Sequence, residues 1–234
     1  MRVLPTLKSL VACAMLIATV CEAASVSAQT RFHGMSASGA RGYAGGGGYT
    51  NWSNGGTTHE ARHWANGVNG GSFSGHNSYN RNPDGSAQAN FSNSGHTADG
   101  GNLSGSGAYS KSANGSWSGN SQSSGSGPHG SYQTSTTTAN GVTTHTATAT
   151  NANGQTYEHS GTYTQGQGYS RSASGPNGSY NTGVTHTQDT TTRSTSMSNA
   201  SGASYNGSTS YTPGQGITHN ANCTNASGAT VSCN

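Results

Sequence analysis

The sequence contains few of the large apolar residues from which a globular core is built. After residue 28, the chain has only nine Leu, Ile, Val and Phe residues: Phe32, Val68, Phe73, Phe91, Leu103, Val142, Val184, Ile217 and Val231. Ordinary domains hold several times this share, and chains below it fall in the range where disorder has to be considered. The composition therefore excludes a conventional core, so any fold must be held together in another way.

Charged residues are scarce as well, at 6% of the chain. Residues 29–234 carry seven basic and five acidic side chains, so 7 minus 5 gives a net charge of +2. Disorder of the usual kind carries a high net charge, which this chain lacks. Because phosphate binding needs grouped Lys and Arg, the sequence predicts no nucleic-acid partner. With five carboxylates a catalytic pair is hard to assemble, and we expect no enzyme activity and no cofactor.

Long hydrophobic runs are absent except near the start. Arg2 and Lys8 precede an apolar run at residues 10–20, and small residues at 26–28 suit a signal-peptide cleavage site. Cleavage after Ala28 and cleavage after Ala23 are equally compatible with this pattern. The run is too short for a transmembrane helix. We therefore expect residues 1–28 to be a secretory signal and the protein to be secreted or extracellular, with the periplasm and the cell surface left open.

Two cysteines remain after the signal, Cys223 and Cys233. In an exported chain a single close pair predicts a disulfide. Both lie five residues from Gly228, so a hairpin loop centred there would set them opposite each other. A bond closing so short a loop contributes about 2 to 3 kcal/mol, mainly by restricting the unfolded chain. A redox or metal pair fits less well, because the spacing is not Cys-x-x-Cys and no histidine cluster adjoins it.

The C-terminal half is a tandem repeat. Residues 143–168 recur without a gap as residues 191–216, and the same shift of 48 carries GPHGSYQT at residue 127 onto GPNGSYNT at residue 175. The repeats are clearest at 128–175 and 176–223. Repeat proteins of this kind add stability unit by unit.

Turn signals recur from position 49 onward, and the segments that separate the first eight of them are 9 to 15 residues long. They are Asn54-Gly55, Asn66-Gly67, Pro83-Asp84-Gly85, Asp99-Gly100, Asn114-Gly115, Pro128-His129-Gly130, Asn140-Gly141, Asn153-Gly154, Pro176-Asn177-Gly178, Ser201-Gly202 and Ser227-Gly228. Such spacing predicts an all-β fold over residues 49–234, an elongated antiparallel meander of tandem hairpins whose sheet is open or curled. A solenoid-like or barrel closure stays open. Residues 29–48, rich in Gly, Ala and Ser, are expected to form a flexible leader.

Aromatic residues share a strand face in both repeats. Alternation places Tyr157 and Tyr163 on one side, and Tyr205 and Tyr211 on the matching side. Further rings follow soon after turn glycines, at Tyr109, Trp117, Tyr132, Tyr169 and Tyr180. Cross-strand ring pairs and rings lying over glycines contribute about 0.2 to 1 kcal/mol each, so we expect a ladder of rings to replace the missing core.

One motif resembles that of the zincin metalloproteases: His59-Glu60-Ala61-Arg62-His63, a literal H-E-x-x-H. That chemistry requires a helix. The frame Gly-x-Thr-Thr-His around His59 recurs at residues 141–145, within the repeat, which predicts a strand instead. On a strand, four residues span about 13 Å, too far for two ligands of one zinc ion. A zinc protease is therefore the least favoured function.

Two further patterns suggest binding. Scattered histidines could hold a transition metal loosely, although His145 is replaced by Arg193 in the second repeat. Alternating threonines at 144, 146, 148 and 150 resemble the Thr-x-Thr arrays of ice-binding β-solenoids, but serines replace three of them in the second repeat. Ordinary surface strands rich in Thr and His explain both patterns without any ligand.

Taken together, the sequence predicts a secreted, non-enzymatic structural or adhesive repeat protein of the cell surface or extracellular matrix. Its expected partners are further copies of itself, joined through sheet edges, or cell-surface components. The alternative is a secreted binding module for ice, glycan or loosely bound metal on a Thr- and Tyr-rich sheet.

Overall fold

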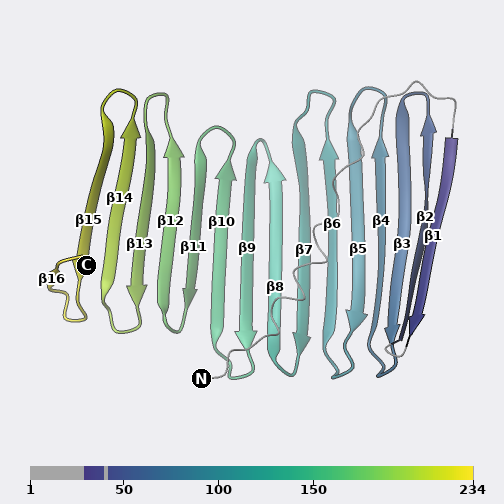
Figure 1. Ribbon diagram of the computed structural model, residues 1–234, viewed down its shortest axis with the longest axis horizontal. Helices are drawn as coiled ribbons and strands as arrows, with labels where there is room; N and C mark the ends of the chain where they lie inside the picture. Colours follow the sequence, from purple (N-terminus) through teal and green to yellow (C-terminus); the bar gives the residue numbers. More distant parts are fainter. Residues whose placement is uncertain (1–28, 40–41, 234) are drawn as a thin grey trace.

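The computed structural model describes residues 29–39 and 42–233, which form a single antiparallel sheet. Its sixteen strands lie side by side in chain order (Figure 1). They are β1 (Gln29–Gly39), β2 (Gly42–Ser53), β3 (Gly56–Gly67), β4 (Ser72–Arg81), β5 (Ala87–His96), β6 (Asn102–Lys111), β7 (Trp117–Gly127), β8 (Gly130–Ala139), β9 (Val142–Asn151), β10 (Thr156–Thr164), β11 (Gly168–Gly175), β12 (Gly178–His186), β13 (Thr191–Asn199), β14 (Ser204–Thr212), β15 (Gly216–Thr224) and β16 (Thr230–Val231). The predicted all-β meander is confirmed, and the sheet is open. The predicted signal at 1–28 lies outside the described residues.

Seven of the turns are five-residue loops of one form. In each loop the first residue's N–H donates to the fifth residue's carbonyl, and the N–H of a glycine at position four donates to the first residue's carbonyl. Asn151 shows why the loop is stable, since its Oδ1 accepts the N–H groups of Asn153 and Gln155 at 3.0 Å. Gly154 then takes φ of 76°, a left-handed conformation that glycine adopts without strain. The seven loops are 67–71, 82–86, 97–101, 112–116, 151–155, 199–203 and 225–229.

Most predicted turn signals mark real turns, with one shift and three omissions. Asn66 and Gly67 belong to β3, and the turn follows them around Gly70. The missed turns join β10 to β11, β12 to β13 and β14 to β15. They carry Gln-Gly-Gln, Thr-Gln-Asp-Thr and Pro-Gly-Gln in place of the Asn-Gly and Asp-Gly pairs, which is why a search for those pairs passes over them.

Residues 29–39 and 42–48 differ from the expected flexible leader, because the structure places them in strands β1 and β2. The glycines of β2 are paired residue for residue with β1 on one side and β3 on the other. The Trp64 ring of β3 lies over Gly45, where an added Cβ would stand 2.6 Å from Cζ2. Glycine here gives room for a neighbouring ring, so the segment gains cross-strand contacts that composition alone does not reveal.

The described residues enclose almost no interior. Only Ala87 is a buried hydrophobic residue, at 4% exposure, and Thr182 is the one buried polar residue among them. Each strand contacts only the strands before and after it in the chain. Stability therefore comes from cross-strand pairs between neighbours and is distributed along the array, as in other repeat proteins.

The two faces of the sheet differ sharply in chemistry. Directly paired residues of an antiparallel ladder point to the same face, so the register assigns every side chain. All aromatic residues of β4 to β15 fall on one face. They are Phe73, Tyr79, Phe91, Tyr109, Trp117, Tyr132, Tyr157, Tyr163, Tyr169, Tyr180, Tyr205 and Tyr211. The predicted sharing of a face by the rings of both repeats is confirmed.

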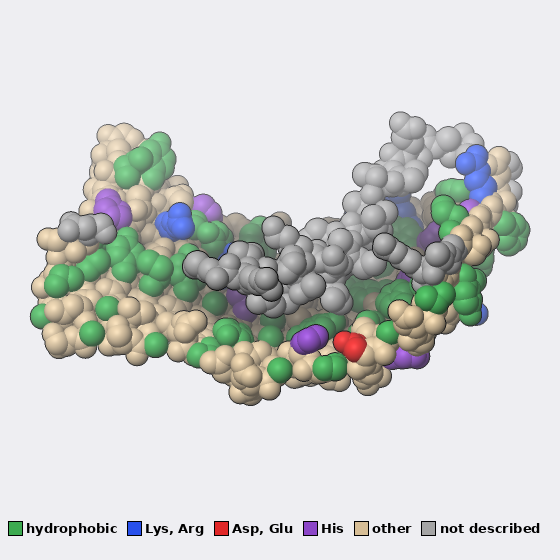
Figure 2. Space-filling view, turned by 60° about the horizontal axis from the view of Figure 1, so that its bottom comes forward, with side chains coloured by type: hydrophobic (Ala, Val, Ile, Leu, Met, Phe, Trp, Pro, Cys, Tyr) green, Lys and Arg blue, Asp and Glu red, His purple; other side chains and the backbone are tan. Residues whose placement is uncertain are grey.

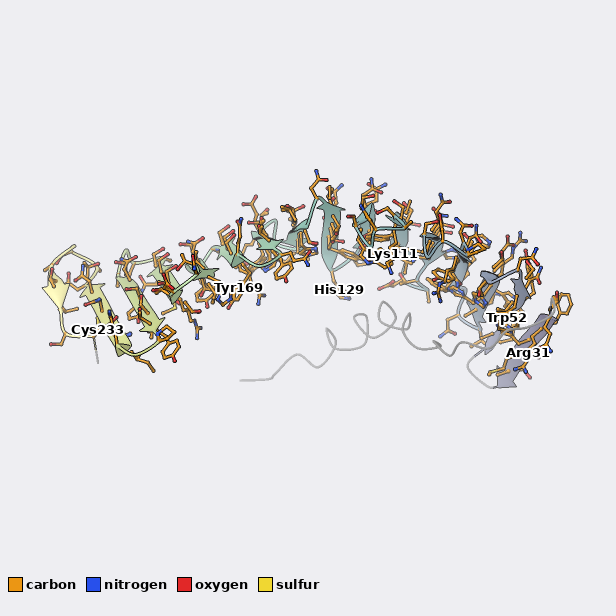
Figure 3. All side chains as sticks on the ribbon, turned by 90° about the horizontal axis from the view of Figure 1, so that it is seen from above. Arg31, Trp52, Lys111, His129, Tyr169 and Cys233 are labelled. Carbon is orange, nitrogen blue, oxygen red and sulfur yellow. A yellow bond between two sulfur atoms is a disulfide. The ribbon has the colours of Figure 1, made fainter. Side chains whose placement is uncertain are left out.

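The ring-bearing face is the inner one of a curved sheet. Trp52 and Tyr169 belong to this face and lie on the inner side of the curve in Figure 3. Figure 2 shows the sheet bent into a trough with hydrophobic side chains gathered along its hollow. We call this the concave face and the opposite one the convex face.

Hydroxyl groups dominate the convex face from β4 to β15. Serine and threonine hydroxyls pair across neighbouring strands, for example Ser160 with Ser172 and Thr192 with Ser210. Similar pairs join Ser104 to Ser124, Ser110 to Ser118, Ser179 to Ser198 and Ser204 to Thr224. These ladders satisfy polar groups at the surface of a single-layer sheet, and they leave the convex face hydrophilic.

The disulfide between Cys223 and Cys233 is present, with a Cα–Cα distance of 5.4 Å. The last hairpin is not centred on Gly228, as expected from the symmetry of the cysteines. Its register pairs Cys223 with Val231, and Asn225 opens the five-residue loop. The bond therefore runs diagonally, to a residue two positions beyond the opposed one.

Candidate binding face and open edges

The H-E-x-x-H motif lies on β3, as the repeat predicts. His59 and His63 point to the concave face, whereas Glu60 points to the convex face, beside its pairing partner Tyr49. Four residues of strand separate the two imidazoles by about 13 Å. The structure thus brings neither the two histidines to one point nor the glutamate to either of them.

Each histidine of the motif has its own partners. His59 Nδ1 lies 2.8 Å from Thr50 Oγ1, and its ring stacks on that of His33 with centroids 5.5 Å apart. Burial, and then the neighbouring His33, hold the pKa of His59 below its usual value. His63 instead stacks on Phe73, with centroids 5.5 Å apart. These contacts are those of packed surface rings.

A second histidine pair lies at the middle of the sheet. The rings of His145 on β9 and His159 on β10 have centroids 5.7 Å apart. Burial, then Arg171 and His145, lower the pKa of His159. Within 29–39 and 42–233, no three His, Cys, Asp or Glu side chains gather closely enough to hold a metal ion.

Large side chains recur on every second strand of the concave face. Six such residues are each second or third in their strands: Phe73 on β4, Leu103 on β6, Tyr132 on β8, Tyr157 on β10, Tyr180 on β12 and Tyr205 on β14. We call this set the even-strand row. Neighbouring strands lie about 4.8 Å apart, so members that are level with each other on successive even strands are spaced by about 9.6 Å.

Small residues separate the members of the even-strand row. Gly95, Gly125 and Ala149 lie between the first four members in direct register. Tyr180 is level with His159, two residues along β10 from Tyr157, and Tyr205 is level with Tyr180 across Met197. Large and small side chains therefore alternate along the row, except that the large residue Met197 stands between Tyr180 and Tyr205.

A groove of about 600 Å³ opens on the concave face at this point. Its main walls are the side chains of Tyr157, Tyr180, Met197 and Tyr205, and Asn177 and Asn199 lie among the other lining residues. No charged residue lines it. The sequence predicted the three tyrosines but not Met197. Met197 follows Tyr180 by the same number of residues as Ala149 follows Tyr132 in the first repeat.

The sheet has two open edges. The outer edge of β1 pairs with no other strand among the described residues, and β16 covers only Cys223 and Thr224 of β15. Phe32 and Met35 on β1 are 81% and 78% exposed. Both edges therefore present backbone N–H and C=O groups that another strand can pair with.

Comparisons of the chain with protein-family models, with curated proteins and with solved structures gave no match. Nor does the described part of the chain contain a helix long and apolar enough to cross a bilayer.

Proposed function

We propose that this chain is a secreted, non-enzymatic structural or adhesive protein of the cell surface or extracellular matrix, which associates with further copies through its sheet edges. The observation that supports this most directly is a sixteen-stranded, single-layer sheet with an open strand at each end. An exposed long edge strand is a template for pairing with another chain. The Cys223–Cys233 disulfide suits an oxidising compartment outside the cytoplasm.

Strand direction limits how two copies can join. β1 and β15 run parallel to each other, because they are separated by an even number of reversals in an all-antiparallel sheet. Simple translation would therefore create a parallel pair, whereas a two-fold axis beside β1 creates an antiparallel β1–β1 pair. Antiparallel pairs are slightly more stable per residue. We favour the symmetric β1–β1 contact, with Phe32 of each copy close to the junction.

The test is the size of the secreted protein as a function of its concentration. We expect light scattering to report an apparent mass that rises with concentration, and electron microscopy to show ribbons one sheet thick or symmetric pairs. A single monomeric species at every concentration would remove edge pairing from the proposal.

The second candidate is a binding module, and the groove at Tyr157, Tyr180 and Tyr205 favours it. Ice and loosely bound metal have no comparable support. The threonine row that includes Thr144 and Thr146 lies on the convex side of a curved sheet, whereas an ice-matching surface has to be flat. Thermal hysteresis and zinc titration test these two ligands directly.

A further inference from the structure

We propose that the concave groove between β10 and β14 binds a neutral, β-1,4-linked oligosaccharide, lying across the strands along the even-strand row. This inference goes beyond self-association, because it uses the face of the sheet and not its edges.

The rings are placed to stack on sugars. Tyr157 lies over Gly175, where an added Cβ would stand 2.7 Å from its Cδ1, and the Tyr205 hydroxyl lies over Gly207. A ring that rests on a glycine has one face against the backbone and the other toward solvent. The C–H-bearing face of a pyranose packs against such an exposed ring, as a nucleic-acid base does in sequence-tolerant stacking. Met197 between Tyr180 and Tyr205 supplies an adaptable apolar floor.

The charge of the groove selects a neutral ligand. Its lining consists of Tyr, Met, Ala, Gly, Ser and Asn residues, without Lys, Arg, Asp or Glu. Amides and hydroxyls such as Asn177 and the tyrosine O–H groups can donate and accept hydrogen bonds to sugar hydroxyls. A charged polymer would gain no opposite charge here, and a purely aliphatic ligand would leave these polar groups without partners.

The spacing selects the linkage. Tyr180 and Tyr205 stand level on β12 and β14, about 9.6 Å apart, and Tyr132 and Tyr157 stand level on β8 and β10 at the same spacing. Between these two pairs the row steps by two residues along the strands. In an extended β-1,4-linked chain the sugars alternate in orientation, so every second ring presents the same face at a repeat close to two strand spacings. An α-1,6-linked chain has no such extended repeat. The distance between strands therefore favours a β-1,4-linked chain over an α-1,6-linked one.

The probe is cellohexaose, with isomaltohexaose as the linkage control, titrated into the isotope-labelled secreted protein and followed by amide shifts and calorimetry. We expect saturable binding of cellohexaose alone, with shifts concentrated in β10 to β14. Tyr180→Ala and Tyr205→Ala should each weaken binding by about tenfold, the loss expected when one ring-stacking contact is removed. Tyr205→Phe keeps the ring and should keep most of the affinity.

Two tyrosines outside the groove give matched controls. Tyr211 lies on the same strand and face as Tyr205, and Tyr163 has the same relation to Tyr157. Tyr211→Ala and Tyr163→Ala should leave the affinity within about twofold of its original value. The inference is overturned by absence of saturable cellohexaose binding, by equal binding of isomaltohexaose, or by equal losses in groove and control variants. Should an alanine variant unfold, the shift map of the unaltered protein decides the site.

Discussion

The ring of Tyr157 on β10 lies over Gly175 on β11, beside the first paired residues of the two strands, Glu158 and Ser174. The same relationship joins Phe73 to Gly95 and Tyr132 to Gly125. In each pair the glycine leaves the backbone bare and the ring covers it, so apolar area is removed from water without a second layer. A sheet that buries almost nothing in an interior can therefore gain its apolar contacts one pair at a time.

We predict that Gly175→Ala destabilises the sheet around β10 and β11. The new methyl group would stand 2.7 Å from Cδ1 of Tyr157, so the ring has to leave its position over the backbone. Overpacking of this kind costs about 1 to 3 kcal/mol. Amide hydrogen exchange measured strand by strand should show faster exchange in β10 and β11.

Gly161→Ala on β10 is the matched control. An added Cβ there meets its nearest atoms at 3.5 and 3.6 Å, which is ordinary contact. We expect exchange rates close to those of the unaltered protein, because a surface substitution without such a clash changes stability by about 0.5 kcal/mol or less. Equal effects of the two substitutions would show that the ring position contributes nothing.

We predict that Cys233→Ser loosens only the C-terminal end of the array. The disulfide holds β16 against the last residues of β15, and β15 otherwise contacts only β14. Its loss should lower the local free energy of opening by about 2 to 3 kcal/mol. Hydrogen exchange should accelerate at Thr224 and Val231 and stay unchanged in β1 to β10, and collapse of the circular dichroism signal of the whole protein would refute this local role.

The order of the strands in the sheet is largely predictable from the sequence. Asn and Gly at the turns, alternation within the repeats and the cysteine pair together predict the meander, the shared face of Tyr157 and Tyr163, and the terminal disulfide. The prediction of a flexible leader at residues 29–48 was wrong for the residues that the structure describes, because a glycine-rich segment can have either of two roles. In a linker it gives freedom, whereas at Gly45 it gives room for the Trp64 ring, and only the register distinguishes the two.

The candidate groove was only partly predictable. Its tyrosines were found from strand alternation, but alternation relates residues within one strand and says nothing about which strands their neighbours come from. The position of Met197 between Tyr180 and Tyr205 depends on the lengths of two loops, and one of them, at 187–190, carries none of the expected turn signals.

We predict that stability falls as pH decreases through the range in which histidine is protonated. The pKa values of His59 and His159 are lowered, mainly by burial, so the unfolded chain binds more protons than the folded one below about pH 6.5. Their contribution is present above that value and is lost as pH falls toward the lowered pKa values. Thermal unfolding between about pH 8 and pH 5 should show a falling midpoint.

Substitution identifies the histidines responsible for this pH dependence. His59→Gln with His159→Gln should flatten the profile, because a glutamine amide does not titrate in this range. A slope that persists in the double variant would assign the effect to other groups.

We predict that charge on β1 suppresses association and that the same charge elsewhere does not. Ser36 and Ser38 are exposed residues of the edge strand β1, on the convex face. Lysines on an edge strand oppose strand pairing with another copy. Ser36→Lys with Ser38→Lys should therefore shift light scattering toward the monomer.

The position of the charge distinguishes edge pairing from general repulsion. Ser92→Lys with Ser94→Lys adds the same two charges to the convex face of β5, in the interior of the sheet. This control should associate as the unaltered protein does. Thr218→Lys with Asn220→Lys charges the opposite edge, β15, and should also leave a symmetric β1–β1 pair intact. Loss of association in all three variants would point to net charge, and loss in the β15 variant alone would favour pairing through that edge.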